Sequence, residues 1–340
     1  MNEADRQQPP RLLLIGNDQP EHIGAHLREA ARELNIALTF LNVTDANGRW
    51  WWNRKFHWWF RGRRPARLKA FSAAVVEECR RRKPRWLLTT GIAPVEQTAL
   101  HAIGGLGVQR LNYLTDDPWN PAHRAPWFLA ALPHYDAVFS PRRANVEELR
   151  AAACRQVEYL PFAYAPEVHY PEVGDDEEGA EVVFAGGGDA DRAPYIGALR
   201  DAGIKVALFG GYWNRYRQTR GLSRGLLPPD RLRRAIAASK IALCLVRRAN
   251  RDGHVMRTFE IPAIGTCMLT EDTAEHREIF GQDGEAVRYF RTVEEMVERA
   301  RWLLAHDEER KRLAAAAHRL ITGGGHRYQD RLQQMLKVAL

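Results

Sequence analysis

The stretch that decides the fold of the second half of the chain is RDGHVMRTFEIPAIGTCMLTE, residues 251–271. Its polar start predicts a loop, its centre predicts a short helix over Phe259–Pro262, and its end predicts an apolar strand over 266–270. We expect Pro262 in the first turn of the helix, where a missing N–H costs nothing, and Gly265 just past the helix end. A loop, helix and strand in this order are typical of an α/β sheet.

The start of this helix contains residue types that bind a nucleoside diphosphate. A helix that begins beside a parallel strand offers unpaired N–H groups and the positive end of its dipole to a phosphate. Glu260 can accept hydrogen bonds from two ribose hydroxyls, and Arg257 is a fork-shaped donor for phosphate oxygens. Thr258, His254 and Arg248 are further donor-binding candidates. His254 could equally be a loop residue without a partner.

The same region resembles a known family. The residues that carry the resemblance are Met256–Ala263 with Gly265 and Leu269–Glu271, then Phe280, Phe290, Glu294, Glu295, His326–Tyr328 and Arg331. They are similar to the C-terminal half of the CgeB-type, spore-maturation-like glycosyltransferases of the GT-B superfamily. The resemblance covers residues 182–336 well and the first half of the chain loosely.

This resemblance implies a fold, an activity and two residue roles. The fold is an α/β GT-B fold, with two Rossmann-like domains whose parallel sheets face each other across a cleft. Many retaining members of the superfamily hold the donor with two acidic residues that have seven residues between them. Asp252 and Glu260 have this spacing. By resemblance, Asp252 would contact the sugar and Glu260 the ribose.

The length of 340 residues suits two domains, and an acidic segment separates two α/β patterns. A capping-box spacing from Thr292 to Glu295 predicts a helix to about Ala305. The expected parts are a disordered tail (1–10), an acceptor-side domain (11–163) with a basic Trp-rich insertion (46–69), a linker (164–180), a donor domain (181–325), and a C-terminal helix (326–340) that crosses back to the first domain.

Two turns outside the opening stretch add candidates. Gly186 and Gly187 follow the first strand of the second domain, where glycine permits close approach of the backbone to a phosphate or sugar. Arg192 and Arg247 are weaker phosphate candidates, and surface solvation is the favoured interpretation for Arg192.

An acidic turn follows an expected strand in the first domain. Asp116 and Asp117 lie at its carboxyl end, the edge at which ligands bind in open α/β sheets. A carboxylate there could take the proton of an acceptor hydroxyl, so Asp116, Asp117 and Asp252 are the catalytic candidates. Asp116 could equally cap the turn before Pro118. Two adjacent aspartates do not predict a metal site, and we expect none.

The net charge of +8 is concentrated between residues 46 and 76, where eight Lys or Arg residues occur without an acid. Tryptophans interrupt this segment, and at a helical period Trp51, Trp52, Trp58 and Trp59 share a face opposite Arg54. A membrane-docking helix, a lining for a lipid-linked or aromatic acceptor, and interdomain packing all fit this pattern. Nucleic acid fits it less well.

Composition also bears on location. The first ten residues form no apolar signal core, and the sequence has no apolar run of membrane-spanning length. Four scattered cysteines show neither metal-ligand spacing nor a disulfide framework. We therefore expect a cytoplasmic protein that can contact the inner face of the membrane as a peripheral protein.

The sequence leaves three functions open. The first is a metal-independent glycosyltransferase without a cofactor, whose substrate is a UDP-, GDP- or dTDP-linked sugar and whose acceptor is unknown. A nucleotide-sugar epimerase of the GT-B type keeps the fold and releases no glycosylated acceptor. The third is a noncatalytic adaptor that binds a membrane surface or nucleic acid through residues 49–69, with no affinity for a nucleotide sugar.

Overall fold

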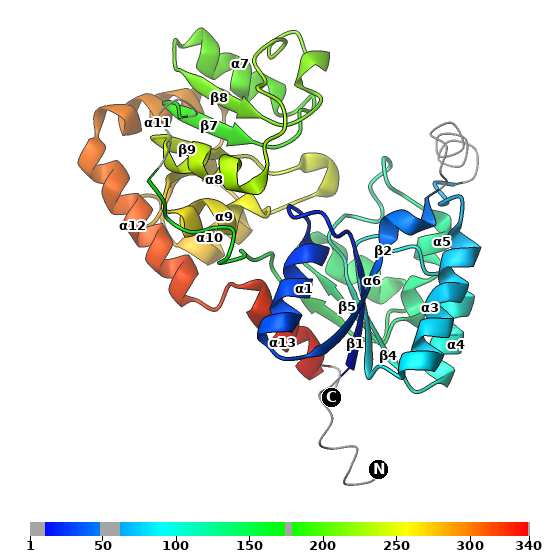
Figure 1. Cartoon of the computed structure of the whole chain (residues 1–340). Helices are drawn as coiled ribbons and strands as arrows, with labels where there is room; N and C mark the ends of the chain where they lie inside the picture. The colour runs from blue at the N-terminus through cyan, green and yellow to red at the C-terminus, as the bar shows by residue number, and fades with distance from the viewer. Residues whose placement is uncertain (1–10, 48–61, 174–178, 339–340) are drawn as a thin grey trace. The chain divides into compact units, whose positions relative to one another are not determined.

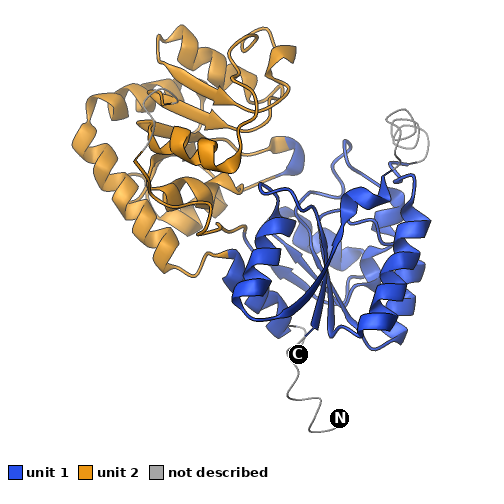
Figure 2. Cartoon of the chain, viewed as in Figure 1, with its two compact units in different colours: residues 1–161, 249–251, 328–340 blue, residues 162–248, 252–327 orange. Residues whose placement is uncertain are grey.

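The computed structural model describes residues 11–47, 62–173 and 179–338. These residues form two compact units, coloured separately in Figure 2. Unit 1 contains residues 1–161, 249–251 and 328–340, and unit 2 contains residues 162–248 and 252–327. Each unit has its own parallel sheet with flanking helices, so the chain has the α/β class that the sequence predicts.

The sheet of unit 1 has six parallel strands in the order β2-β1-β3-β4-β5-β6 (Figure 1). The strands are β1 (Arg11–Gly16), β2 (Ala37–Asn42), β3 (Trp86–Thr90), β4 (Gln109–Tyr113), β5 (Ala137–Ser140) and β6 (Val157–Tyr159). The helices are α1 (Ile23–Glu33), α3 (Leu68–Arg82), α4 (Gln97–Gly105), α5 (Pro126–Leu129), α6 (Val146–Ala151) and α13 (Tyr328–Val338), with 3₁₀ turns at Val43–Ala46, Leu132–His134 and Arg143–Asn145.

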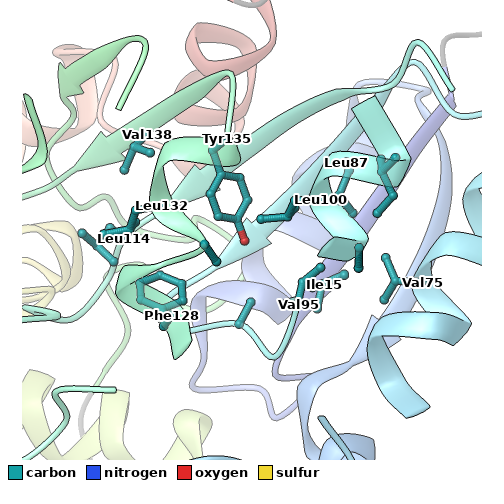
Figure 3. Packing of buried hydrophobic residues seen from close by; sticks show 14 of the residues in the cluster. Ile15, Val75, Leu87, Val95, Leu100, Leu114, Phe128, Leu132, Tyr135 and Val138 are labelled. Atoms are coloured by element: carbon teal, nitrogen blue, oxygen red, sulfur yellow. The ribbon is translucent and has the colours of Figure 1, made fainter. Parts of the chain in front are cut away.

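Apolar side chains on both faces hold this sheet. Leu12 to Ile15 of β1 are all buried, as expected for a strand that is covered by helices on both sides. Figure 3 shows Ile15 and Leu87 of the sheet packed with Leu100 of α4 and with Phe128 and Tyr135. The Tyr135 hydroxyl is within 3.0 Å of the Thr89 hydroxyl, so the one polar atom of this side chain has a partner inside the core.

The turn between β1 and α1 requires glycine at two positions. A Cβ on Gly24 would lie 2.5 Å from the Asn17 carbonyl oxygen, and a Cβ on Gly16 would lie 2.8 Å from the Gly24 Cα. The helix can therefore approach the strand end closely only without these side chains. The C-terminal helix α13 packs on α1 in the same unit, with the Tyr328 ring stacked on His26 at 5.0 Å.

The sheet of unit 2 has five parallel strands in the order β11-β10-β9-β7-β8. The strands are β7 (Val182–Ala185), β8 (Val206–Phe209), β9 (Ile241–Cys244), β10 (Cys267–Glu271) and β11 (Arg288–Phe290). The helices are α7 (Ala193–Asp201), α8 (Pro229–Ala237), α9 (Arg257–Ile264), α10 (Ala274–Phe280), α11 (Val293–Ala305) and α12 (Asp307–Gly323), with 3₁₀ turns at Trp213–Arg215 and Arg248–Asn250. The Thr292 hydroxyl accepts from the Glu295 N–H at the start of α11, which confirms Thr292 as the cap of the predicted helix, and the Glu295 carboxylate accepts from the Arg291 N–H at 2.9 Å.

The chain passes between the units at places that composition does not reveal. Residues 162–173, expected in the first domain and a linker, belong to unit 2, where Tyr164 pairs with Arg327. Residues 249–251, expected in the donor domain, belong to unit 1. Backbone pairing and side-chain contacts, rather than proline and acid content, decide both assignments.

We predict that Gly24→Ala lowers the free energy of unfolding by about 1–3 kcal/mol, because the added methyl group meets backbone atoms that cannot move aside. Urea unfolding would measure the change. Gly105→Ala is the matched control, because its Cβ would meet nothing within 4 Å. Equal stability of Gly24→Ala and the wild-type protein would show that the turn relaxes without cost.

Candidate functional site

Helix α9 lies at the centre of the candidate site in unit 2. It begins at Arg257, two residues before the predicted start, so Pro262 lies inside the helix and not in its first turn. The reason is an upstream turn, in which the Thr258 N–H donates to the Val255 carbonyl oxygen at 3.0 Å. The predicted helix end is confirmed, because Gly265 has a positive φ of 87° and caps the last turn.

This upstream turn also uses N–H groups that the sequence assigns to a phosphate. The N–H groups of Phe259 and Glu260 donate to the Met256 carbonyl oxygen at 3.0 and 3.2 Å. With the bond from Thr258, three N–H groups near the helix start already have acceptors. The expectation of unpaired N–H groups is therefore wrong at these three positions, and the cationic side chains become the stronger phosphate candidates.

Glu260 is held in a fixed orientation. Its side chain is 1% exposed and forms an ion pair with Arg257, one turn earlier on α9. His169 lies on the other side, with Nε2 3.7 Å from Glu260 Oε1. Because His169 Nδ1 accepts from the Ala165 N–H at 3.1 Å, the proton of the neutral ring is on Nε2 and faces the carboxylate. The sequence contains no signal for His169, since no motif links it to α9.

His254 is buried and has partners on both ring nitrogens. Its Nε2 accepts from the Phe162 N–H at 3.2 Å, so Nδ1 carries the proton and donates to Glu275 Oε2 at 2.5 Å. The interpretation of His254 as a loop residue without a partner is therefore wrong. Both nitrogens serve the protein itself, and the side chain ties the loop before α9 to the segment that begins at Phe162. A direct contact of His254 with a donor stays a prediction.

Thr258 is also part of a buried polar cluster. Its hydroxyl lies 2.9 Å from His276 Nε2 and accepts from the Val255 N–H at 3.1 Å. His276 Nδ1 lies 2.8 Å from the Glu271 carbonyl oxygen, which can only accept, so the proton is on Nδ1 and Thr258 donates to Nε2. Burial lowers the pKa of His276 to about 4, which keeps the ring neutral.

Arg192 connects two loops at the carboxyl edge of the sheet. It is buried, and its guanidinium donates to the Gly187 carbonyl oxygen at 3.2 Å and to the Leu245 carbonyl oxygen at 3.1 Å. Burial lowers the pKa of Arg192, and the charge of Asp189 opposes this effect. Surface solvation, the interpretation favoured from the sequence, is therefore wrong. Arg192 holds the loop after β7 against the loop after β9.

Arg248 lies on the loop after β9 and is half-exposed. Its Nη2 donates to Glu271 Oε1 and to the Tyr195 hydroxyl, both at 3.0 Å. The other Glu271 oxygen accepts from the Val246 N–H at 2.6 Å, so the carboxylate fixes this loop. Glu271 ends β10, and strand-end position was the signal that could have identified it.

In the glycine turn after β7, two backbone N–H groups continue the hydrogen bonding of the sheet. The N–H groups of Gly186 and Gly188 donate to the carbonyl oxygens of Phe209 and Gly211, both at 2.9 Å. A Cβ on Gly188 would lie 2.8 Å from the Trp213 ring, so packing requires that glycine. A Cβ on Gly187 would have only the Tyr212 ring within 4 Å, at 3.9 Å. Gly187 is therefore the position of this turn that packing leaves open.

The acidic turn of unit 1 follows β4. Asp117 is buried and accepts from the Trp119 N–H at 3.0 Å, Asn145 Nδ2 at 3.0 Å and Arg251 Nε at 2.7 Å. These three donors give Asp117 a structural role. Asp116 is half-buried, with Asn250 Nδ2 3.4 Å from Oδ1. Of the two aspartates, Asp116 is the better candidate for chemistry, and its role stays a prediction.

The predicted site residues therefore fall into three sets. Those in unit 2 are Gly186, Gly187, Arg248, Asp252, His254, Arg257, Thr258 and Glu260. Asp252 is buried, and its N–H donates to the Arg247 carbonyl oxygen at 3.2 Å. Asp116 and Asp117 belong to unit 1. Trp51, Trp52, Trp58, Trp59 and Arg54 lie outside the described residues.

Two searches concern the described residues as a whole. Over residues 11–47, 62–173 and 179–338, no group of three or more His, Cys, Asp or Glu side chains could hold a metal ion. In the same ranges, none of the helices combines the length and the apolar character that crossing a bilayer requires.

Comparisons with known proteins agree with this architecture. A family model described as "Glycosyl transferase-like" matches residues 192–337, which include α9. No curated protein matches the sequence. Among solved structures, a sucrose-phosphate synthase from Thermosynechococcus elongatus is similar, with a TM-score of 0.71 and 11% identity over 97% of this chain and 98% of that chain.

Two further solved structures contain nucleotide sugars. HepE of Anabaena in complex with UDP-glucose has a TM-score of 0.64 and 12% identity, over 96% of this chain and 98% of that chain. UDP-GlcNAc 2-epimerase from Neisseria meningitidis bound to UDP-GlcNAc has a TM-score of 0.58 and 11% identity, over 96% of this chain and 100% of that chain. At these identities the likeness shows the fold, which is the GT-B fold that the sequence predicts.

We predict that His276 makes the protein less stable as the pH falls from about 6.5 toward 4. In this window the unfolded chain binds a proton that the folded protein does not, so the free energy of unfolding falls by up to about 1.4 kcal/mol per pH unit. Above about pH 6.5 the ring is neutral in both states and contributes no slope. His276→Gln should have a shallower slope than the wild-type protein in urea unfolding between about pH 4.5 and 6.5, and the same slope above this range.

Thr270→Val is the control for this prediction. It removes a hydroxyl that lies 3.2 Å from His276 Nδ1, so it disturbs the same cluster and keeps the titrating ring. It should lower the stability and retain the pH slope. Parallel slopes for wild-type protein and His276→Gln would contradict the assignment.

Proposed function

We propose that the chain is a glycosyltransferase that moves a sugar from a nucleoside-diphosphate sugar to an acceptor hydroxyl without a metal ion. The observation that carries the proposal is the geometry around Glu260. Its buried carboxylate is oriented by Arg257 and His169 at the start of α9. In a doubly wound parallel sheet this helix starts at the carboxyl edge, where nucleotides bind.

The ribose would bind by an exchange of partners at Glu260. Arg257 is partly exposed and pairs with the carboxylate on α9, whereas His169 is buried. Two ribose hydroxyls can replace the Arg257 guanidinium as donors to the carboxylate. Arg257 would then be available to the neighbouring diphosphate, and His169 would continue to orient Glu260.

The transfer itself breaks the bond between the anomeric carbon and the diphosphate oxygen and forms a bond from that carbon to the acceptor oxygen. Negative charge develops on the departing diphosphate, and Arg257 and Arg248 can stabilise it in place of a metal ion. The acceptor hydroxyl loses its proton to a base. Asp116 is the candidate base in our proposal, because Asp117 already accepts from three donors.

The donor class that we propose first is UDP-linked. HepE was solved with UDP-glucose and the Neisseria epimerase with UDP-GlcNAc, and both share this fold. A GDP- or dTDP-linked sugar would meet the same Glu260, since ribose and diphosphate recognition is independent of the base in GDP and UDP. A dTDP-linked donor lacks the 2′-hydroxyl and would form one hydrogen bond fewer.

The likeness to UDP-GlcNAc 2-epimerase supports a second candidate function, epimerisation of a nucleotide sugar. This reaction inverts a carbon of the donor sugar and needs no acceptor. The two functions are distinguished by their products. Incubation with a radiolabelled donor and a mixture of acceptors yields free UDP and a labelled acceptor from a transferase, and a second UDP-sugar from an epimerase.

We predict that UDP raises the melting temperature of the wild-type protein and that Glu260→Gln loses most of this rise. Ligand at about 100 times Kd stabilises the folded state by about 2.7 kcal/mol, which a thermal-shift assay detects. Glu298→Gln, an exposed position on α11, is the matched control and should keep the full rise. The ribose contact has a sharper test in 2′-deoxy-UDP, which should stabilise the wild-type protein less than UDP does.

The deoxy comparison also gives the contradicting outcome. In Glu260→Gln the difference between UDP and 2′-deoxy-UDP should disappear, because the carboxylate that reads the 2′-hydroxyl is gone. A folded Glu260→Gln protein that retains the full rise and the full difference would remove Glu260 from the site. No stabilisation by UDP, GDP or dTDP would remove the nucleotide-sugar proposal.

We predict that Gly187→Ala leaves the melting temperature unchanged and raises the KM for the donor. The added methyl group has only the Tyr212 ring in contact distance, so it harms the turn only where a phosphate or sugar approaches the backbone. Gly188→Ala, its neighbour, should lower the melting temperature because of the Trp213 ring. An unchanged KM in Gly187→Ala would show that the donor does not approach this turn.

A further inference from the structure

A second basic stretch lies in unit 2, over residues 212–234. It contains one acid, Asp230, and seven arginines: Arg215, Arg217, Arg220, Arg224, Arg231, Arg233 and Arg234. The chain outside residues 46–76 has equal numbers of basic and acidic residues, and this balance conceals the stretch. The net excess of charge still equals that of residues 46–76, and the stretch in unit 2 is offset by acidic residues elsewhere in the chain.

The first part of this stretch, residues 212–226, is a well-anchored loop that we call the β8–α8 loop. Trp213 is buried, its indole N–H donates to the Gly186 carbonyl oxygen at 2.9 Å, and its own carbonyl accepts from the Thr219 hydroxyl at 2.9 Å. The Arg224 N–H donates to the Leu208 carbonyl oxygen at 2.8 Å, so the end of the loop covers the edge strand β8 (Figure 1). The backbone of the loop is thus held from inside.

The outer side of the β8–α8 loop combines cations with apolar groups. Tyr212 is 63% exposed and Leu226 is 83% exposed. Arg215, Arg217 and Arg220 are exposed, and within the part of the chain that the structure describes none of the three forms an ion pair. The Arg215 guanidinium lies 4.4 Å from the centre of the Tyr212 ring, so the aromatic ring and the charge form one surface.

Helix α8, by contrast, is largely neutralised. Arg233 and Arg234 pair with Glu172 at 2.7 and 3.2 Å, and Asp230 lies 3.9 Å from Arg234. Arg215, Arg217 and Arg220, which form no ion pair within the described ranges, all lie in the β8–α8 loop. Tyr212 and Leu226 add exposed apolar area to the same loop.

We propose that the β8–α8 loop is a docking surface for an anionic phospholipid membrane. Arginines attract the negatively charged headgroups, and each basic residue near such a surface adds to the binding. Tyr212 and Leu226 can then enter the boundary between headgroups and acyl chains, which buries the apolar area that is exposed in the free protein. A nucleic acid would satisfy the arginines and leave Leu226 exposed. This inference does not depend on the proposed glycosyl transfer.

The test is co-sedimentation of the full chain with vesicles of phosphatidylcholine, with and without phosphatidylglycerol, at low and high salt. We expect binding only to the vesicles with phosphatidylglycerol, and weaker binding at high salt. Arg217→Ser with Arg220→Ser should weaken binding about tenfold to thirtyfold. Leu226→Ser should weaken it about threefold or more and should leave the salt dependence unchanged.

The matched control is Arg319→Ser with Lys337→Ser, which removes the same charge from exposed positions on α12 and α13. It should bind as the wild-type protein does apart from the small effect of net charge. Circular dichroism would establish that all variants are folded. Every variant retains residues 48–61. A difference in binding between the arginine variant and the control is therefore due to the β8–α8 loop and not to that segment.

Three results would overturn the proposal. One is wild-type protein that does not bind the anionic vesicles. Another is an equal loss of binding in Arg217→Ser with Arg220→Ser and in the control variant, which would show that only the net charge of the protein matters. The third is tight binding to single-stranded RNA that the arginine variant loses and Leu226→Ser retains, which would make the loop a nucleic-acid surface.

Discussion

The candidate site of unit 2 depends on one buried cation, Arg192. A buried guanidinium is costly without hydrogen-bond acceptors and a nearby negative charge, and here the Gly187 and Leu245 carbonyl oxygens accept from it while Asp189 Oδ2 lies 3.6 Å from its Nε. This requirement fixes the loop after β7 against the loop after β9. The side chains that we assign to a donor lie on these loops or directly after them, so their position depends on the contacts that Arg192 makes.

The same constraint separates the residues that build the site from those that can change partners. His254 and Thr258 are buried, and their polar atoms are bonded within unit 2. Arg248 and Arg257 are partly exposed and pair with Glu271 and Glu260. The carboxylates of these two pairs are buried, so a ligand can displace Arg257 or Arg248 only where its own donors bond to Glu260 or Glu271 in their place. Arg248 and Arg257 are therefore the groups that can change partners, and the buried network holds the rest of the site.

Much of the architecture could be predicted from local patterns. The apolar run of β10 and the helix cap at Thr292 are properties of neighbouring residues, and the structure has these elements within about two residues of the predicted bounds. Helix α9 was harder, because its start depends on carbonyl oxygens of Val255 and Met256 that no propensity reveals. Local sequence describes which element forms, and less well where it begins.

The sequence predicted which types of residue form the site, but it did not predict which residues they contact. The acid in α9 and the arginine before it were identified from the chemistry that a nucleotide requires, whereas His169 and Glu271 were missed and the environment of Arg192 was misjudged. These three depend on contacts between residues 25 to 91 positions apart, such as Glu271 with Val246 and His169 with Glu260. By itself the sequence determined the alternation of strands and helices, the glycine at the end of α9 and the positions of the basic stretches. Only the tertiary structure decided which polar groups are buried and bonded, because the partner of a buried polar group is set by how distant segments pack and not by its neighbours in the chain.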